Sequence, residues 1–163
     1  MLNKNLLLFA VLLVLFAFPA SASMVSFLLV ETGLNEEAVS TPYTGLWEGG
    51  LMDVFFDAGF IVTNSPVARI EKKPARDISG LVEEDYREAI EGGAEYFVLG
   101  YLEYQNKGGK ILPARISLKL YKTDSQKLIY EQNFPAGSGK DYDEEYLLAK
   151  NAGRTIISKL KDR

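Results

Sequence analysis

The chain has 163 residues, of which 18 are Lys or Arg and 22 are Asp or Glu, giving a net charge of −4. A mildly acidic chain lacks the positive field that nucleic-acid binding needs, so we expect no nucleic-acid partner. Cysteine and histidine are absent, which excludes disulfides, thiol or imidazole nucleophile systems, zinc sites built on these residues, and the acylated cysteine of a lipoprotein.

Residues 1–22 have the three-part layout of a secretory signal. Lys4 is followed by an unbroken run of 13 apolar residues, 6–18, and the segment ends Pro-Ala-Ser-Ala, the small-x-small pattern that signal peptidase cuts. A membrane-spanning helix needs roughly 20 residues, so we expect cleavage after Ala22. The predicted product, residues 23–163, is one globular domain that is periplasmic or secreted and meets a membrane only through the signal segment before cleavage.

The spacing of apolar residues and of Gly and Pro predicts five strands and three helices. In chain order these are a buried strand over 25–30, a helix over 42–58 capped by Thr41, a strand over 60–63, a helix over 81–91, strands over 94–104, 114–122 and 127–134, and a C-terminal helix that starts at Asp141. Residues 67–80, with a basic stretch at 72–76, read as an exposed loop.

Three local patterns add detail to these elements. The pair Gly49-Gly50 lies inside the first helix and predicts close backbone packing there. Trp47, Leu51, Val54, Phe55 and Ala58 form one apolar stripe on that helix. In 114–122 apolar residues alternate with Arg115, Ser117, Lys119 and Tyr121, which predicts a strand with one face in water.

The order β-α-β-α-β-β-β-α, with short strands that are buried or amphipathic, favours a single mixed sheet covered by helices, in the α/β or α+β class. The segments 51–62, 93–100 and 118–129 resemble the periplasmic domains shared by the amino-terminal part of TolB, the penicillin-binding-protein activator lipoproteins and the curli secretion channel. The resemblance implies an anticodon-binding-like, TolB amino-terminal-like fold. It also implies an envelope domain that binds another protein and assists an assembly.

The resemblance carries over no catalytic or binding residue, because the matching segments are structural. The sequence departs from the group in lacking the acylated cysteine and in having Asp124-Ser125 at a turn where the group often has glycine. The acidic clusters 36–37, 83–85 and 141–145 lie in predicted loops or first helical turns, where water and the helix dipole favour the charged form. We therefore interpret them as surface or capping groups.

The sequence favours a non-enzymatic protein-binding or assembly module without a cofactor or metal site. Its predicted partner is another envelope protein, bound at a surface formed by Lys72, Lys73, Arg76, Lys119 and Tyr121. Two alternatives stay open. A carboxylate-pair hydrolase acting on envelope polysaccharide would show two shielded carboxyl groups across a cleft. A carrier of a lipid or small apolar ligand would show a deep apolar cavity.

Overall fold

The computed structural model describes residues 22–34 and 42–161. The signal segment up to residue 21, the polar loop 35–40 and the predicted cap Thr41 lie outside the described residues.

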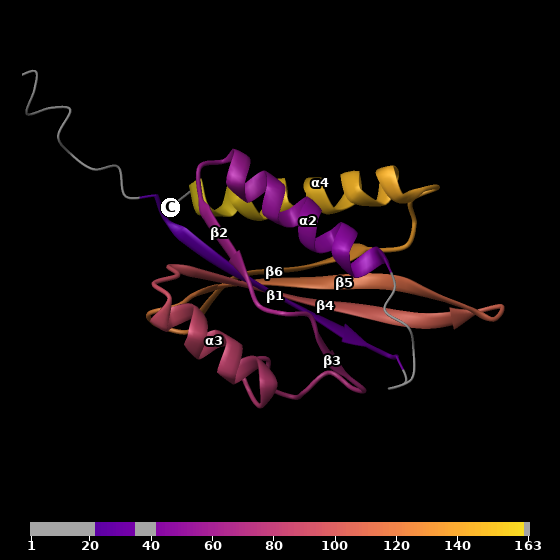
Figure 1. Cartoon of the computed structure of the whole chain (residues 1–163), viewed down its shortest axis with the longest axis horizontal. Helices are drawn as coiled ribbons and strands as arrows, with labels where there is room; N and C mark the ends of the chain where they lie inside the picture. The colour runs from indigo at the N-terminus through magenta and orange to yellow at the C-terminus, as the bar shows by residue number, and fades with distance from the viewer. Residues whose placement is uncertain (1–21, 35–41, 162–163) are drawn as a thin grey trace, which may run out of the picture.

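One six-stranded mixed sheet forms the middle layer (Figure 1). Its strands are β1 (Met24–Thr32), β2 (Ile61–Asn64), β3 (Ala68–Ile70), β4 (Tyr96–Lys107), β5 (Lys110–Lys122) and β6 (Lys127–Pro135). The order across the sheet is β2-β1-β4-β5-β6, with β3 also paired to β1. β1 is parallel to β2, β3 and β4, and β4, β5 and β6 form an antiparallel meander.

Two helices cover one face of the sheet and one helix covers part of the other (Figure 1). α2 (Pro42–Asp57) and α4 (Tyr142–Lys161) lie together above the sheet, and α3 (Leu81–Glu91) lies below it. The core on the upper face contains Trp47 and Phe55 of α2, with Phe55 edge-on to Phe27 of β1. On the lower face Tyr86 of α3 packs edge-on against Phe97 of β4.

Glycines let α2 and α4 approach closely. A Cβ added to Gly50 would lie 2.7 Å from the Cβ of Ala149 and 3.0 Å from the backbone oxygen of Tyr146. On the other helix, a Cβ added to Gly153 would lie 2.3 Å from a methyl group of Val54. The close packing predicted from Gly49-Gly50 is therefore confirmed, and Gly50 is the member of the pair that makes it.

The five predicted strands and three predicted helices are all present, and the predicted mixed sheet is confirmed. The predicted element order was incomplete, because residues 67–80 were read as loop and contain β3, which pairs with Val30–Thr32 of β1. A strand of three residues is too short to show alternation, so only pairing with β1 reveals it. The glycine pair after β4 makes the predicted tight turn, with positive φ at Gly108 and Gly109.

The prediction that one face of β5 meets water holds for Arg115 but is wrong for the other three residues of that face. Ser117, Lys119 and Tyr121 are buried, with Lys119 only 7% and Tyr121 only 6% exposed. Asp77, in the segment between β3 and α3, accepts hydrogen bonds from Lys119 and Tyr121. Conversely, Ala58 at the end of the predicted α2 stripe is exposed, because the chain has left the helix at that residue.

The contact between α2 and α4 can be tested with two substitutions in α2. Gly50→Ala should lower the free energy of unfolding by about 1–3 kcal/mol, because the new methyl group overlaps α4. Gly45→Ala is the matched control, since a Cβ there meets nothing within 4 Å, and it should be neutral or raise stability by up to about 1 kcal/mol. Urea unfolding measures both. Equal effects would contradict the assignment of Gly50 to the helix contact.

Candidate partner-binding surface

Residues 71–80 form a strap that links β3 to α3 and lies over the lower face of the sheet. Asp77 fixes it there. The Asp77 carboxylate accepts hydrogen bonds from Lys119 Nζ at 2.6 Å and from the Tyr121 hydroxyl at 2.8 Å. Lys119 also pairs with Glu131 of β6 at 3.0 Å. The strap is thus attached to β5 and, through Lys119, to the edge strand.

A second set of contacts fixes the strap to β4. The Tyr101 hydroxyl donates to the backbone oxygen of Asp77 at 3.3 Å, and Lys73 Nζ lies 4.7 Å from the centre of the Tyr101 ring. Lys73 is half-buried in this cation–π contact, whereas Lys72 and Arg76 are exposed. The strap therefore holds its inner side against the sheet, and its exposed charges are those of Lys72, Arg76 and Glu71.

The electrostatics of the cluster follow from burial beside Asp77. Burial raises the pKa of Tyr121, and the hydrogen bond to Asp77 and its charge raise it further. Burial and the charge of Asp77 likewise raise the pKa of Tyr101. Burial by itself lowers the pKa of Lys119, but its hydrogen bonds and ion pairs with Asp77 and Glu131 outweigh that effect, so the pKa is raised. Both tyrosines stay neutral and the lysine stays charged at neutral pH.

The structure brings the two parts of the predicted partner surface together, but their exposure differs. Lys72 and Arg76 lie on the exposed side of the strap, as predicted. Lys119 and Tyr121 are instead buried beneath it, so they support the surface and do not form it. Sequence reasoning missed Asp77, although an acidic residue directly after a basic stretch was a usable signal.

Two buried carboxylates were also missed or misread. Glu145, interpreted as part of a solvated or capping cluster, has 0% exposure. Its carboxylate accepts hydrogen bonds from Trp47 Nε1 at 2.7 Å, Gly137 N at 2.7 Å and Gly139 N at 3.0 Å. These bonds fix the β6–α4 connection against α2, which is why burying this acid is tolerated.

Glu31, at the end of β1, is 1% exposed. One of its oxygens accepts the Thr44 hydroxyl at 2.5 Å, and the other accepts Arg69 Nε at 3.0 Å and a terminal Arg69 nitrogen at 2.7 Å. Because the Thr44 hydrogen goes to Glu31, the Tyr104 hydroxyl donates to Thr44 at 2.7 Å. Glu31 therefore ties β3 and α2 to the central strand.

These acids bear on the hydrolase alternative. A general acid must face substrate in a cleft, yet protein donors engage both oxygens of Glu31 and of Glu145. Neither residue lines any of four well-formed cavities in the described part of the chain. Glu31 and Glu145 therefore hold elements together, and neither is free to act as a general acid.

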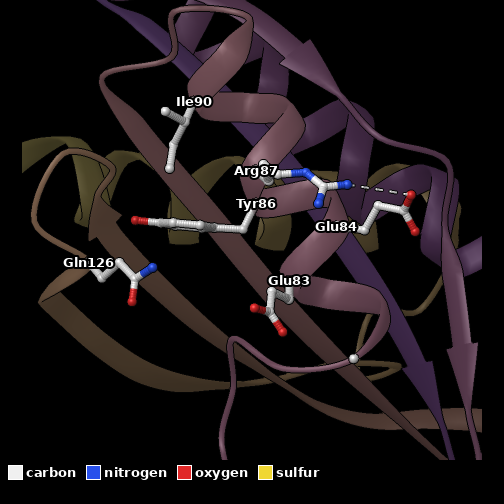
Figure 2. Close-up of a pocket in the computed structure, with 7 residues that line it drawn as sticks. Glu83, Glu84, Tyr86, Arg87, Ile90 and Gln126 are labelled. Atoms are coloured by element: carbon white, nitrogen blue, oxygen red, sulfur yellow. Dashed lines mark ion pairs between the residues drawn. The ribbon is translucent and has the colours of Figure 1, made fainter.

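The cavities bear on the carrier alternative. The largest of these four, about 420 Å³, lies beside α3 between Gly80 and the β5–β6 turn, and Glu83, Glu84 and Arg87 supply much of its lining. Figure 2 shows Tyr86 reaching from α3 toward Gln126 in that turn. The most apolar cavity, beside Trp47, is about 120 Å³, whereas pockets for drug-sized ligands span roughly 300–1,000 Å³. A lipid chain does not fit there.

Within residues 22–34 and 42–161, no group of three or more acidic side chains is arranged to hold a metal ion. In the same part of the chain, no helix combines the length and apolar character that crossing a bilayer requires.

The strap's attachment can be tested with Asp77→Asn. Replacing the carboxylate weakens two hydrogen bonds and leaves Lys119 with Glu131 as its ion-pair partner, so stability should fall by about 1–3 kcal/mol. The loosened strap should also be cut by trypsin after Lys72 several-fold faster than the parent. Glu103→Gln, which removes an exposed ion pair with Arg115, is the control and should leave cleavage unchanged. Unchanged cleavage of Asp77→Asn would contradict the anchoring role.

Tyr101 and Tyr121 should make the protein sensitive to alkali. A tyrosine with a raised folded-state pKa keeps its proton longer in the folded than in the unfolded chain. Its stabilising contribution is complete below the unfolded value of about 10 and is lost as pH rises above it. Urea unfolding between pH 8 and 11 should show stability falling above pH about 10. Tyr121→Phe should make that fall shallower, and an unchanged slope would refute the role of this hydroxyl.

Comparisons with known proteins agree with this architecture. No curated protein matches the sequence. The structure is similar to the PelC dodecamer from Paraburkholderia phytofirmans, with 12% identity, coverage of 85% of this chain and 87% of that chain, and a TM-score of 0.50. At this identity the match shows a shared fold.

Two further solved structures come from the group that the sequence resembles. TolB from Acinetobacter baumannii matches with 12% identity and a TM-score of 0.39, covering 85% of this chain and 28% of TolB. The LpoB C-terminal domain from Salmonella enterica matches with 14% identity and a TM-score of 0.45, covering 78% of this chain and 93% of that domain. A family model matches residues 25–160, and the chain therefore belongs to that family, which is described as "Uncharacterised protein".

Proposed function

We propose that this protein is a non-enzymatic module of the bacterial cell envelope that binds another envelope protein through the exposed side of the strap. The apolar segment and small-x-small pattern of residues 1–22 support export. PelC, whose fold the chain shares, is a dodecamer, so this architecture is compatible with work in a protein assembly.

The observation that carries the proposal is the two-sided strap. Asp77 fixes the inner side to Lys119 and Tyr121, while Lys72 and Arg76 stay exposed. A segment already held in one conformation loses less entropy on binding than a free loop. Two exposed cations on such a segment suit a partner with an acidic surface, since complementary charge steers association and sets specificity.

A binding role is favoured over hydrolysis because the buried carboxylates Glu31 and Glu145 are engaged by internal donors. We place the protein in the periplasm or outside the cell, cleaved and without a lipid anchor. The lack of cysteine in the 163 residues supports the missing anchor. The similar structures give no support on this point, since a lipoprotein from Neisseria meningitidis is among them.

Charge reversal on the strap tests the proposal. A photo-crosslinking residue at position 72 of the exported protein identifies the neighbour in the envelope, and titration with that purified neighbour then gives the dissociation constant. Lys72→Glu/Arg76→Glu should weaken binding at least about tenfold, and added salt should weaken the parent complex. Lys107→Glu/Lys110→Glu, an equal charge change on the exposed β4–β5 hairpin, is the matched control.

Two outcomes would overturn the proposal. One is binding that both double variants weaken equally, which would reflect total charge and not the strap. The other is release of sugar from cell-wall material by the purified protein, which would establish an enzyme.

A further inference from the structure

The chain enters the sheet immediately after the predicted cleavage bond. The backbone oxygen of Ser23 accepts a hydrogen bond from Ile61 N at 3.0 Å, on the β2 side. The backbone oxygen of Met24 accepts one from Glu95 N at 2.9 Å, on the β4 side. The backbone therefore has hydrogen-bond partners on both sides within two residues of Ala22.

The Ser23 side chain is held as well. Its hydroxyl donates to Glu95 Oε2 at 2.5 Å, and Lys122 Nζ donates to the other oxygen of Glu95 at 2.6 Å. The backbone oxygen of Glu95 also accepts from Thr123 N at 3.1 Å. The hydrogen bonds from Lys122 and then from Ser23 lower the pKa of Glu95, so this carboxylate is charged at neutral pH. Glu95 thus joins the start of β1 to the end of β5.

We propose that the Ala22–Ser23 bond is the processing site, that it must be cut before β1 enters the sheet, and that Glu95 then binds the new α-ammonium group of Ser23. This inference rests on the export step of the proposed function and is independent of the strap.

The order of events follows from the hydrogen bonds. A peptidase that takes its substrate as an extended strand needs free backbone N–H and C=O groups beside the scissile bond. In the folded protein β2 and β4 already use the groups that follow this bond. A chain that folds first therefore keeps its apolar segment, and a chain that is cut first is released.

The products of the cut explain the role of Glu95. Hydrolysis adds one water: the carbonyl carbon of Ala22 gains the hydroxyl and becomes a carboxylate, and the Ser23 nitrogen gains protons and becomes an ammonium. That nitrogen is three bonds from the hydroxyl oxygen that touches Glu95. The new positive charge therefore forms close to the Glu95 carboxylate, whose other oxygen binds Lys122.

The processing step is tested on the folded full-length protein in detergent micelles with purified signal peptidase. A second version carries Ser-Gly-Ser-Gly inserted between Ala22 and Ser23, which keeps serine after the cut and moves the bond away from the sheet. We expect the insertion to speed cutting at least about tenfold, since the bond is then in unpaired chain. Equal rates would overturn the coupling to folding, and no cutting of the insertion version would overturn the site.

The terminal contact is tested on the protein exported and processed by a bacterial host. Intact mass should show loss of residues 1–22, and any other terminus contradicts the assignment.

After ¹³C-methylation of the α-amino group, NMR titration should give a pKa about one unit above the ordinary value, which is that of the same methylated group in an unstructured peptide. Glu95→Gln should return it to the ordinary value, whereas Glu83→Gln, on the exposed face of α3, should not. If Glu95→Gln leaves the α-amino pKa unchanged, the proposed contact between Glu95 and the α-ammonium group is wrong. Loss of partner binding with these results intact would instead count against the proposed function.

Discussion

The fold depends on burying β1, of which all residues except Met24 are buried. Val25 to Val30 are buried, and the strand pairs with β2 and β3 on one edge and with β4 on the other. A strand with side chains in both cores and backbone partners on both edges supplies much of the burial that holds a small domain without disulfides together. Each remaining element packs on β1 or extends the sheet that starts from it.

The two faces of the sheet are closed by different means. On the upper face two long helices cross at Gly50 and Gly153, and their apolar residues fill one core. On the lower face a single helix covers only part of the sheet (Figure 1), and the strap covers the region around Tyr101, Lys119 and Tyr121. The surface proposed for binding thus exists because α3 leaves part of the lower face of the sheet uncovered, and the strap covers that part.

Four carboxylates hold peripheral elements and connecting segments against the rest of the fold. Glu31 holds β3 and α2, Glu145 holds the β6–α4 connection, Asp77 holds the strap, and Glu95 holds the start of the chain. Each has cationic or N–H and O–H donors within hydrogen-bonding distance, which offsets the cost of removing charge from water. These four acidic residues therefore contribute internal hydrogen bonds as well as negative charge.

The sequence by itself determined the elements that repeat over many residues. Apolar runs and glycine or proline stops were sufficient for β1, the three helices and the β4–β5–β6 meander, because local spacing decides which face of an element is apolar. Local spacing does not report what lies above a face. The alternation in β5 predicted a wet surface, and only tertiary structure placed the strap over it, buried Lys119 and Tyr121, and supplied Asp77. The three-residue β3 and the buried Glu31 and Glu145 were decided in the same way, since each depends on partners distant in the chain.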